Sequence, residues 1–497
     1  MKKSGVLLPI TSLPSDGGIG CFSKSAYDFV DFLKESGQSY WQILPLGHTG
    51  YGDSPYQSFS AFAGNPYMIS LDDLADEGLI SKEECNVLSC KNDGYVDYSL
   101  QFNHRYTLLY KAFEQWNSSN EEEYKNFVSE NEFWLEDYSL FMALKYHFGN
   151  MSSLHWEEGI RRRKPEALEK YRITLSKETD FWKFVQFKFF SQWDKLKKYA
   201  NGLGIEIMGD MPIYVSGDSS DVWANPHLFR LDENLIPTHV AGCPPDGFSE
   251  DGQLWGNPLY NWEVHKKDDY SWWVMRIKYS FRLFDCLRID HFRGFEKYYS
   301  IPFGAKNARS GKWEQGPGEE LFLTVERKLG KKNIVAEDLG FITGEVKELL
   351  RKCGFAGIKV LEFAFDERDT GISSDYLPHN YPENCVAYTG THDNEPIQSW
   401  FESMGKDTKH NIRKYLWDFH SPDKEIYKPL LCSVMRSPAK TVILPLWDIL
   451  GLGSEARVNT PGTDSGNWTW RVKKEMITKD VSEFLKEITT LYDRCPK

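Results

Sequence analysis

Short apolar runs alternate along the chain with segments in which apolar residues recur every three or four positions. Runs of the first kind are typical of buried parallel strands, and segments of the second kind are typical of helices that cover a sheet. Eight such runs predict strands, at 5–10, 40–46, 205–212, 286–290, 334–339, 358–365, 386–393 and 442–447.

Helical patterns separate most of these runs. One stripe is formed by Phe181, Val185, Phe189 and Trp193, at steps of four, and should face a sheet. Eight parallel strands with covering helices predict a closed (β/α)₈ TIM barrel of the α/β class. An open doubly wound sheet is the structural alternative, but it usually has fewer strands, and no G-x-G-x-x-G motif follows any of the runs.

The alternation is lost between about 47 and 180, where loop sequence is followed by charge-rich helical sequence. We therefore expect one barrel domain over 1–497, with a mainly helical insertion at about 47–180. Stretches rich in Gly and Pro predict shaped loops at about 242–262 and 451–470. Because few residues follow the eighth run, we expect no C-terminal β-sandwich.

The charge balance narrows the range of partners. Lys and Arg number 59 and Asp and Glu number 72, which gives a net charge of −13. An acidic chain argues against nucleic acid and anionic membrane as main partners. The nine cysteines are irregularly spaced and form no CxxC pair, and no run of 18 apolar residues or signal peptide is present. These features predict a cytoplasmic protein with reduced thiols.

Carboxylates stand at the ends of four of the predicted strands. The third run ends near Asp210, the fourth at Asp290, the fifth at Glu337 and Asp338, and the seventh at Asp393. Any one of them could be a helix cap. Together they indicate an active site, because a TIM barrel carries its active site at the carboxyl ends of its strands.

The spacing of two of these acids suggests a reaction. Side chains alternate along a strand, so Arg288 and Asp290 should both point inward, whereas alternation does not decide between Glu337 and Asp338. Inward carboxylates on adjacent strands would lie roughly 5 Å apart, the separation of a retaining glycosidase pair. We expect Arg288 to lower the pKa of Asp290, which suits a nucleophile, and apolar walls to raise the pKa of Glu337, which suits an acid.

Two other arrangements remain open on these grounds. The acids could form a structural ion cluster around Arg288. They could also bind a metal ion, with candidate ligands Asp210, Asp290, His291, Glu337, His392 and Asp393. Arg288 among them would oppose a cation, so the sequence predicts no metal.

Aromatic and amide side chains gather in the predicted loops. Sugars offer C–H faces that stack on aromatic rings and hydroxyls that need amide, carboxylate or guanidinium partners. The candidates are in YGDSPY from Tyr51, PPDGF from Pro244, QLWGN from Gln253 and RVNTPG from Arg457.

The motifs GYGDSPYQSFSAFAGNPY, GDMPIYVSGDSSDVWANP, PPDGFSEDGQLWGNPLYNW, LRIDHFRGF, AEDLG, TGTHDN and GLGSEARVNTPGT occur in this order. In these motifs the chain resembles the amylomaltases, the 4-α-glucanotransferases of glycoside hydrolase family 77. The resemblance covers nearly the whole chain. One departure is Glu362, which stands where the family usually has Gln.

The resemblance implies a retaining transfer of an α-1,4-glucan segment from a donor maltodextrin to the 4-hydroxyl of an acceptor sugar, through a covalent glucosyl-aspartate and without a cofactor. Asp290 would be the nucleophile, Glu337 rather than Asp338 the general acid/base, and Asp393 the group that stabilises the transition state. Implied substrate-binding residues are Tyr51, Ser54, Tyr56, Asp210, Phe248, Gln253, Trp255, Arg288, His392 and Asn459.

Two other functions would use the same residues. An α-1,4-glucan hydrolase of the amylase type needs the same three carboxylates and differs only in whether water reaches the intermediate first. A catalytically inactive barrel would bind glucan without turnover.

Overall fold

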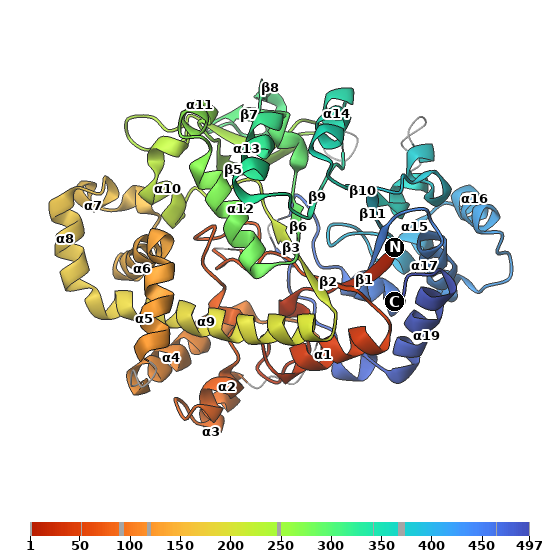
Figure 1. Cartoon of the computed structure of the whole chain (residues 1–497), viewed down its shortest axis with the longest axis horizontal. Helices are drawn as coiled ribbons and strands as arrows, with labels where there is room; N and C mark the ends of the chain where they lie inside the picture. Colours follow the sequence, from red (N-terminus) through yellow and green to blue (C-terminus); the bar gives the residue numbers. More distant parts are fainter. Residues whose placement is uncertain are drawn as a thin grey trace.

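The computed structural model describes residues 2–50, 52–88, 94–116, 121–245, 250–340, 342–365, 373–463 and 465–496. Eight parallel strands form its centre (Figure 1). They are β1 (Lys3–Leu7), β2 (Tyr40–Gln42), β3 (Glu206–Met211), β6 (Cys286–Ile289), β9 (Ile334–Ala336), β10 (Gly357–Val360), β11 (Cys385–Tyr388) and β12 (Thr441–Pro445). Each lies beside its successor, β12 pairs with β1, and a parallel bridge from Val335 to Ala356 joins β9 to the chain entering β10. The predicted α/β barrel is confirmed.

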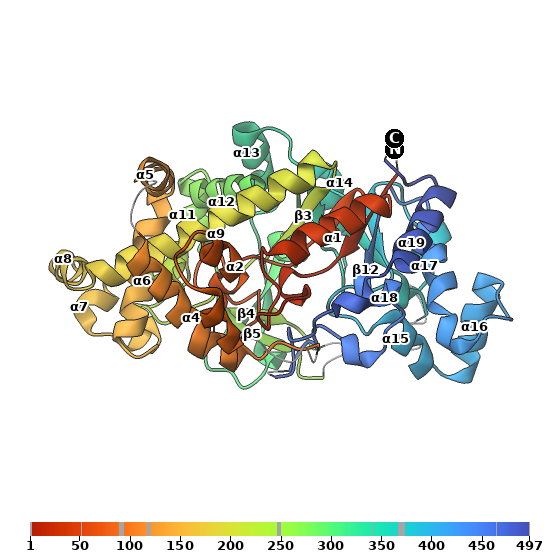
Figure 2. The ribbon, with the colours of Figure 1, turned by 90° about the horizontal axis from the view of Figure 1, so that it is seen from below.

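Long helices cover the barrel from outside (Figures 1 and 2). They are α1 (Lys24–Glu35), α9 (Ser176–Gly202), α12 (Ser271–Leu283), α13 (Glu319–Leu329), α14 (Gly344–Cys353), α17 (Tyr427–Met435) and α19 (Lys479–Leu491). The predicted stripe on α9 is buried throughout, and Trp193 contacts Phe22 of the chain after β1 and Phe284 before β6.

Among the described residues between β2 and β3, seven further helices precede α9 and extend to one side of the barrel in Figure 1. They are α2 (Leu71–Asp76), α3 (Lys82–Cys85), α4 (Tyr98–Gln115), α5 (Glu121–Glu130), α6 (Glu132–His147), α7 (Glu158–Arg161) and α8 (Pro165–Thr174). Their aromatic side chains pack on α9, where Phe184 and Phe187 meet Trp116 and Tyr124. The sequence predicted a mainly helical insertion in this part of the chain.

A second, antiparallel sheet was not predicted. It has the order β5-β4-β7-β8 and consists of β4 (His239–Cys243), β5 (Gln253–Pro258), β7 (Lys297–Pro302) and β8 (Lys312–Gln315). These strands are short, and glycine and proline interrupt them, so they lack the continuous apolar runs of the barrel strands. β5 brings polar and aromatic residues beside the strand ends of the barrel.

Every barrel strand ends earlier than its predicted run, and for β10 and β11 the difference is five residues. β10 ends at Val360 and continues as a 3₁₀ turn (Leu361–Phe365), and β11 ends at Tyr388. Asp393 therefore lies on a turn beyond β11. Short helices α15 (Ile397–Ser403), α16 (Lys406–Leu416) and α18 (Leu446–Ile449) follow β11 and β12, while α10 (Ser220–Ala224) and α11 (Trp262–Lys267) follow β3. No helix within the described residues is long and apolar enough to cross a membrane.

Candidate active site

A buried ion pair joins β3 and β6. Asp210 and Arg288 are paired in the parallel register, so both side chains point from the same face. Arg288 Nη1 donates to both oxygens of Asp210, at 2.7 and 2.6 Å, and Arg288 Nη2 lies 2.9 Å from Asp290 Oδ1. The side chains of Asp210 and Arg288 are only 0% and 4% exposed, whereas that of Asp290 is 27% exposed. The guanidinium thus fixes Asp290 from behind, and the free edge of the carboxyl faces solvent.

Asp290 and Glu337 are neighbours across β6 and β9. Ile289 pairs with Ala336, and the next residue on each strand is one of the two acids. Glu337 Oε2 accepts a hydrogen bond from the backbone N–H of His291 at 2.7 Å, so the Glu337 side chain reaches over to the β6 chain. Its Oε1 accepts from the N–H of Leu339, also at 2.7 Å. The two acids therefore lie beside each other at the carboxyl ends of adjacent strands.

Asp338 has a different environment. It accepts a hydrogen bond from the backbone N–H of Ile358 at 2.6 Å, which ties β9 to β10. Because Asp338 is used in this strand contact, Glu337 is the acid of the pair that lies beside Asp290. Alternation alone could not decide this, since β9 ends at Ala336, before either residue.

The charge state of Asp290 differs from the expectation. Burial raises the pKa of Asp290 to about 8; Arg288 acts against this shift, and the carboxyls of Asp210, Glu337 and Asp393 add to it. The predicted lowering is therefore wrong, because burial outweighs the effect of Arg288 and the surrounding acids add to the shift. Burial also raises the pKa of Glu337, despite its two backbone donors, as expected. Burial thus favours the protonated form of both acids.

The turn after β11 supplies the third acid. Asn459 Nδ2 donates to Asp393 Oδ1 at 2.6 Å, and His392 Nε2 lies 3.4 Å from Asp393 Oδ2. The hydroxyl of Tyr56 donates to Asp210 Oδ2 at 2.7 Å and lies 2.8 Å from His392 Nε2, while its ring stacks on the imidazole at 5.4 Å. Burial lowers the pKa of His392, so the ring is neutral. The one hydroxyl proton of Tyr56 goes to Asp210, so the Nε2–H of His392 donates to the Tyr56 oxygen. Tyr56 thus links the ion pair of β3 and β6 to the turn carrying Asp393.

The structure brings most of the other predicted binding residues to the same end. Trp255 packs against His291 with ring centroids 4.8 Å apart and donates to Gln253 Oε1 at 3.0 Å, so β5 borders the Asp290 side. Ser54 lies in the loop that carries Tyr56, and its hydroxyl accepts from the N–H of Tyr56. Tyr51 and Phe248 lie outside the described residues.

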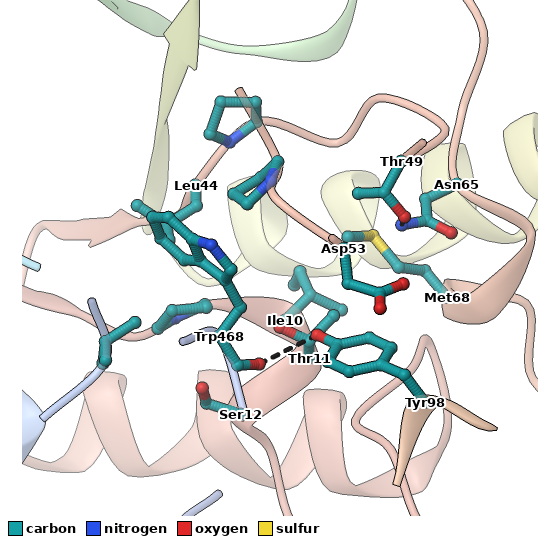
Figure 3. A pocket seen from close by; sticks show the side chains of 14 residues that line it. Ile10, Thr11, Ser12, Leu44, Thr49, Asp53, Asn65, Met68, Tyr98 and Trp468 are labelled. Carbon is teal, nitrogen blue, oxygen red and sulfur yellow. Dashed lines mark hydrogen bonds between the residues drawn. The ribbon is translucent and has the colours of Figure 1, made fainter. Parts of the chain in front are cut away.

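Nothing in the sequence indicated a pocket that lies beside Tyr56 and the acids. Its space of about 430 Å³ is lined by Asp53, Asn65, Tyr98 and Trp468, among others. Figure 3 shows the Asp53 carboxyl pointing into it beside the Tyr98 ring, and the Tyr98 hydroxyl donating to the backbone oxygen of Trp468 at 2.8 Å. The Trp468 ring also lies 5.8 Å from that of Tyr56. GNW, the sequence containing Trp468, carried no periodic signal that could have placed it here.

The geometry weighs against a metal centre. The acids surround the Arg288 guanidinium, which opposes a cation. In the part of the chain that the structure describes, no three His, Cys, Asp or Glu side chains are grouped as metal ligands.

Comparison with known proteins identifies the family. The family model described as 4-alpha-glucanotransferase, glycoside hydrolase family 77, matches residues 8–478. A 4-alpha-glucanotransferase of Clostridium butyricum is 49% identical over 491 residues, covering 98% of this chain and 99% of the relative. One of Aquifex aeolicus is 44% identical over 496 residues, covering 99% of this chain and 100% of the relative. The solved structure of an amylomaltase from Streptococcus agalactiae in complex with acarbose superposes with a TM-score of 0.96 at 45% identity and full coverage of both chains. The chain therefore belongs to glycoside hydrolase family 77, the family of 4-α-glucanotransferases.

Proposed function

We propose that this chain performs its family's 4-α-glucanotransferase activity by a retaining, two-step displacement, with Asp290 as nucleophile, Glu337 as general acid/base and Asp393 as stabiliser of the transition state. The observation that carries the proposal is the pairing of Ile289 with Ala336, because it puts the two acids side by side at the end of adjacent strands. Neighbouring strands give a separation of roughly 5 Å, which suits retention and leaves no room for a water between acid and sugar.

In the first step one oxygen of Asp290 attacks C1 of the donor glucose unit and the C1–O4 bond breaks. Arg288 holds Oδ1 of Asp290 at 2.9 Å, which orients the carboxyl and leaves Oδ2 for attack. The proton held on Glu337 passes to the departing O4. In the second step the acceptor's 4-hydroxyl returns that proton to Glu337, while its oxygen attacks C1 and releases Asp290.

Asp393 acts on the sugar ring at the same centre. Its side chain is 41% exposed, so it is open to a ligand, and Asn459 holds its other oxygen. A carboxylate in this place can accept hydrogen bonds from the ring hydroxyls and offset the positive charge that develops at C1. His392 and Arg288 complete the wall of this subsite. Trp255 and Gln253 lie on β5, which borders the same site beside His291, and are the groups available to an acceptor sugar.

Product analysis with maltotriose tests the transfer. Transfer gives glucose and a ladder of longer maltodextrins with a constant total of reducing ends, whereas an α-1,4-glucan hydrolase raises that total. Asp290→Ala should abolish turnover. Turnover that survives this change would remove Asp290 from the mechanism, and a parent protein that binds maltodextrin without turnover would indicate an inactive glucan-binding barrel.

We also propose a cytoplasmic location. No disulfide links the described cysteines, and several of them, such as Cys286 and Cys385, are buried as thiols in barrel strands. Reduced thiols are typical of that compartment.

A further inference from the structure

Glu362 lies behind the turn that carries Asp393. It stands in the 3₁₀ turn (Leu361–Phe365) directly after β10, is only 5% exposed, and its backbone N–H donates to the oxygen of Thr389 at 3.3 Å. The reaction proposed above does not use it. A carboxyl buried this deeply beside an active site needs a reason, because burial without partners is costly.

Asn394 connects Glu362 to the turn. Its Oδ1 accepts hydrogen bonds from both the backbone N–H and the hydroxyl of Thr391, each at 2.9 Å. A backbone N–H can only donate, so the amide oxygen must face Thr391, and the amide nitrogen must face Glu362. Asn394 Nδ2 accordingly donates to Glu362 Oε2 at 3.1 Å. The direction of this bond is therefore fixed: Glu362 accepts.

The bonds of Asn394 close the turn around two site residues. Thr391 Oγ1 accepts from the N–H of Asp393 at 3.3 Å, so Thr391, His392, Asp393 and Asn394 form one hydrogen-bonded unit. If the amide of Asn394 turned away, the N–H of Thr391 would lose its partner and the two residues between them would lose their fixed orientation.

The space around Glu362 fits a neutral acid that holds Asn394. A Cβ on Gly390 would lie 2.7 Å from Glu362 Oε1 and 3.1 Å from the Cβ of Asn394, so the glycine makes room for this contact. The acids Asp448 and Glu395 act on Glu362, and the nearby cation Arg457 already pairs with Glu395 at 2.7 Å. Burial raises the pKa of Glu362 well above its usual range. A neutral carboxyl keeps an oxygen that accepts from the amide of Asn394.

We propose that Glu362 and Asn394 are positioning residues of the transferase: they hold the turn so that Asp393 and His392 meet the donor sugar in the orientation that the transition state needs. This rests on the role proposed above for Asp393. Neither residue touches the reacting atoms. A displacement of about 1 Å at a site can lower the rate by up to about 100-fold, so loss of this clamp should reduce kcat.

Two variants of Glu362 test the clamp. Glu362→Gln keeps an oxygen for Asn394, so its kcat for maltotriose should stay within about 3-fold of the parent, whereas Glu362→Leu removes the acceptor and should lower kcat by about 10- to 100-fold. Because the clamp acts on the transition state, KM should change by less than about 3-fold. Equal kcat for the Leu variant and the parent would overturn the proposal.

A reversal of the bond gives an independent test. Asn394→Asp keeps the acceptor for Thr391 but sets two carboxyls against each other, which forces them to share a proton and makes kcat fall steeply as pH rises. Adding Glu362→Gln supplies a donor amide and should restore kcat at pH 8. A double variant no better than Asn394→Asp at that pH refutes the pairing.

Two controls separate the possible failures. Asp221→Asn alters a different buried carboxyl, which accepts from the N–H of Ala61. This control should change thermal stability but leave both kcat and KM as in the parent. Asp393→Asn should abolish turnover. If it does not, the proposed function fails; if it does while Glu362→Leu turns over normally, only the clamp is refuted.

Discussion

Replacing Arg288 with Met should cost both stability and turnover, for separable reasons. Arg288 is 4% exposed and the carboxyl that it holds, Asp210, is 0% exposed. Breaking a buried pair by removing one partner leaves an uncompensated charge and costs about 3–5 kcal/mol. We therefore expect the free energy of unfolding to fall by about that amount in Arg288→Met. Adding Asp210→Asn removes the stranded charge and should recover most of it.

The loss of turnover has another source. At 2.9 Å, Arg288 and Asp290 attract each other by about 6 kcal/mol at an effective dielectric constant of about 20. The 27% exposure of Asp290 and the sharing of the cation with Asp210 reduce this attraction. We therefore expect the loss of Arg288 to raise the pKa of Asp290 by at least about one unit, or about 1.4 kcal/mol. Losing a cation raises the pKa of a carboxyl, so less Asp290 is ionised and the acid limb of the activity profile moves to higher pH.

Two measurements separate the effects. Urea unfolding gives the stability of the parent, Arg288→Met and the double variant, and glucose release from maltotriose gives turnover between pH 5 and 9. The double variant should regain stability but not activity, and Arg288→Lys, which keeps the charge without the planar fork, should lie between parent and Arg288→Met in both. The reasoning is refuted if Asp210→Asn restores no stability or if the acid limb of Arg288→Met stays in place.

Three further outcomes follow from the contacts of the site. Tyr56→Phe loses the hydroxyl that bridges Asp210 and His392 while keeping the ring stack, so kcat/KM should fall by about 5- to 100-fold with little change in Tm, measured by maltotriose kinetics and calorimetry. Glu337→Gln should abolish transfer from maltotriose yet still release fluoride from α-maltosyl fluoride, whose leaving group needs no proton; a dead variant with both donors contradicts the acid role. Burial raises the pKa of Asp448 to about 7, so its contribution to stability is present at low pH and is lost as pH rises from about 4 through 7. Asp448→Asn should therefore reduce the fall in unfolding free energy between pH 4 and 7, measured by urea unfolding. An unchanged slope over this range would contradict the role of Asp448.

Much of the barrel could be predicted because burial on both faces leaves a plain signal. The barrel strands lie in mainly apolar stretches of sequence, and all eight predicted runs contain a strand in the structure. The polar residues at the ends of those runs could be assigned to one end of the barrel for the same reason. The antiparallel sheet could not, since a strand such as β5, QLWGNP, is half exposed and interrupted by glycine and proline.

Side-chain partners were harder to predict than positions. Alternation correctly put Arg288 and Asp290 on one face, but it gave no means to choose Glu337 over Asp338, because that choice depends on the N–H groups of His291 and Ile358 on other strands. Tyr56 contacts Asp210, which lies 154 positions later in the chain, and His392, which lies 336 positions later. No local sequence pattern encodes contacts of this range.

The error over Asp290 shows how the site keeps its proton. In the sequence the cation nearest to Asp290 is Arg288, and this neighbour alone predicts a lowered pKa for Asp290. In the fold, Arg288 Nη1 makes a bidentate contact with Asp210, so much of the cation's charge is already balanced. Burial and the neighbouring acids then raise the pKa of both Asp290 and Glu337. Asp210 thereby lets Arg288 anchor Asp290 while burial still favours the protonated form of the two acids, as the proposed acid role of Glu337 requires.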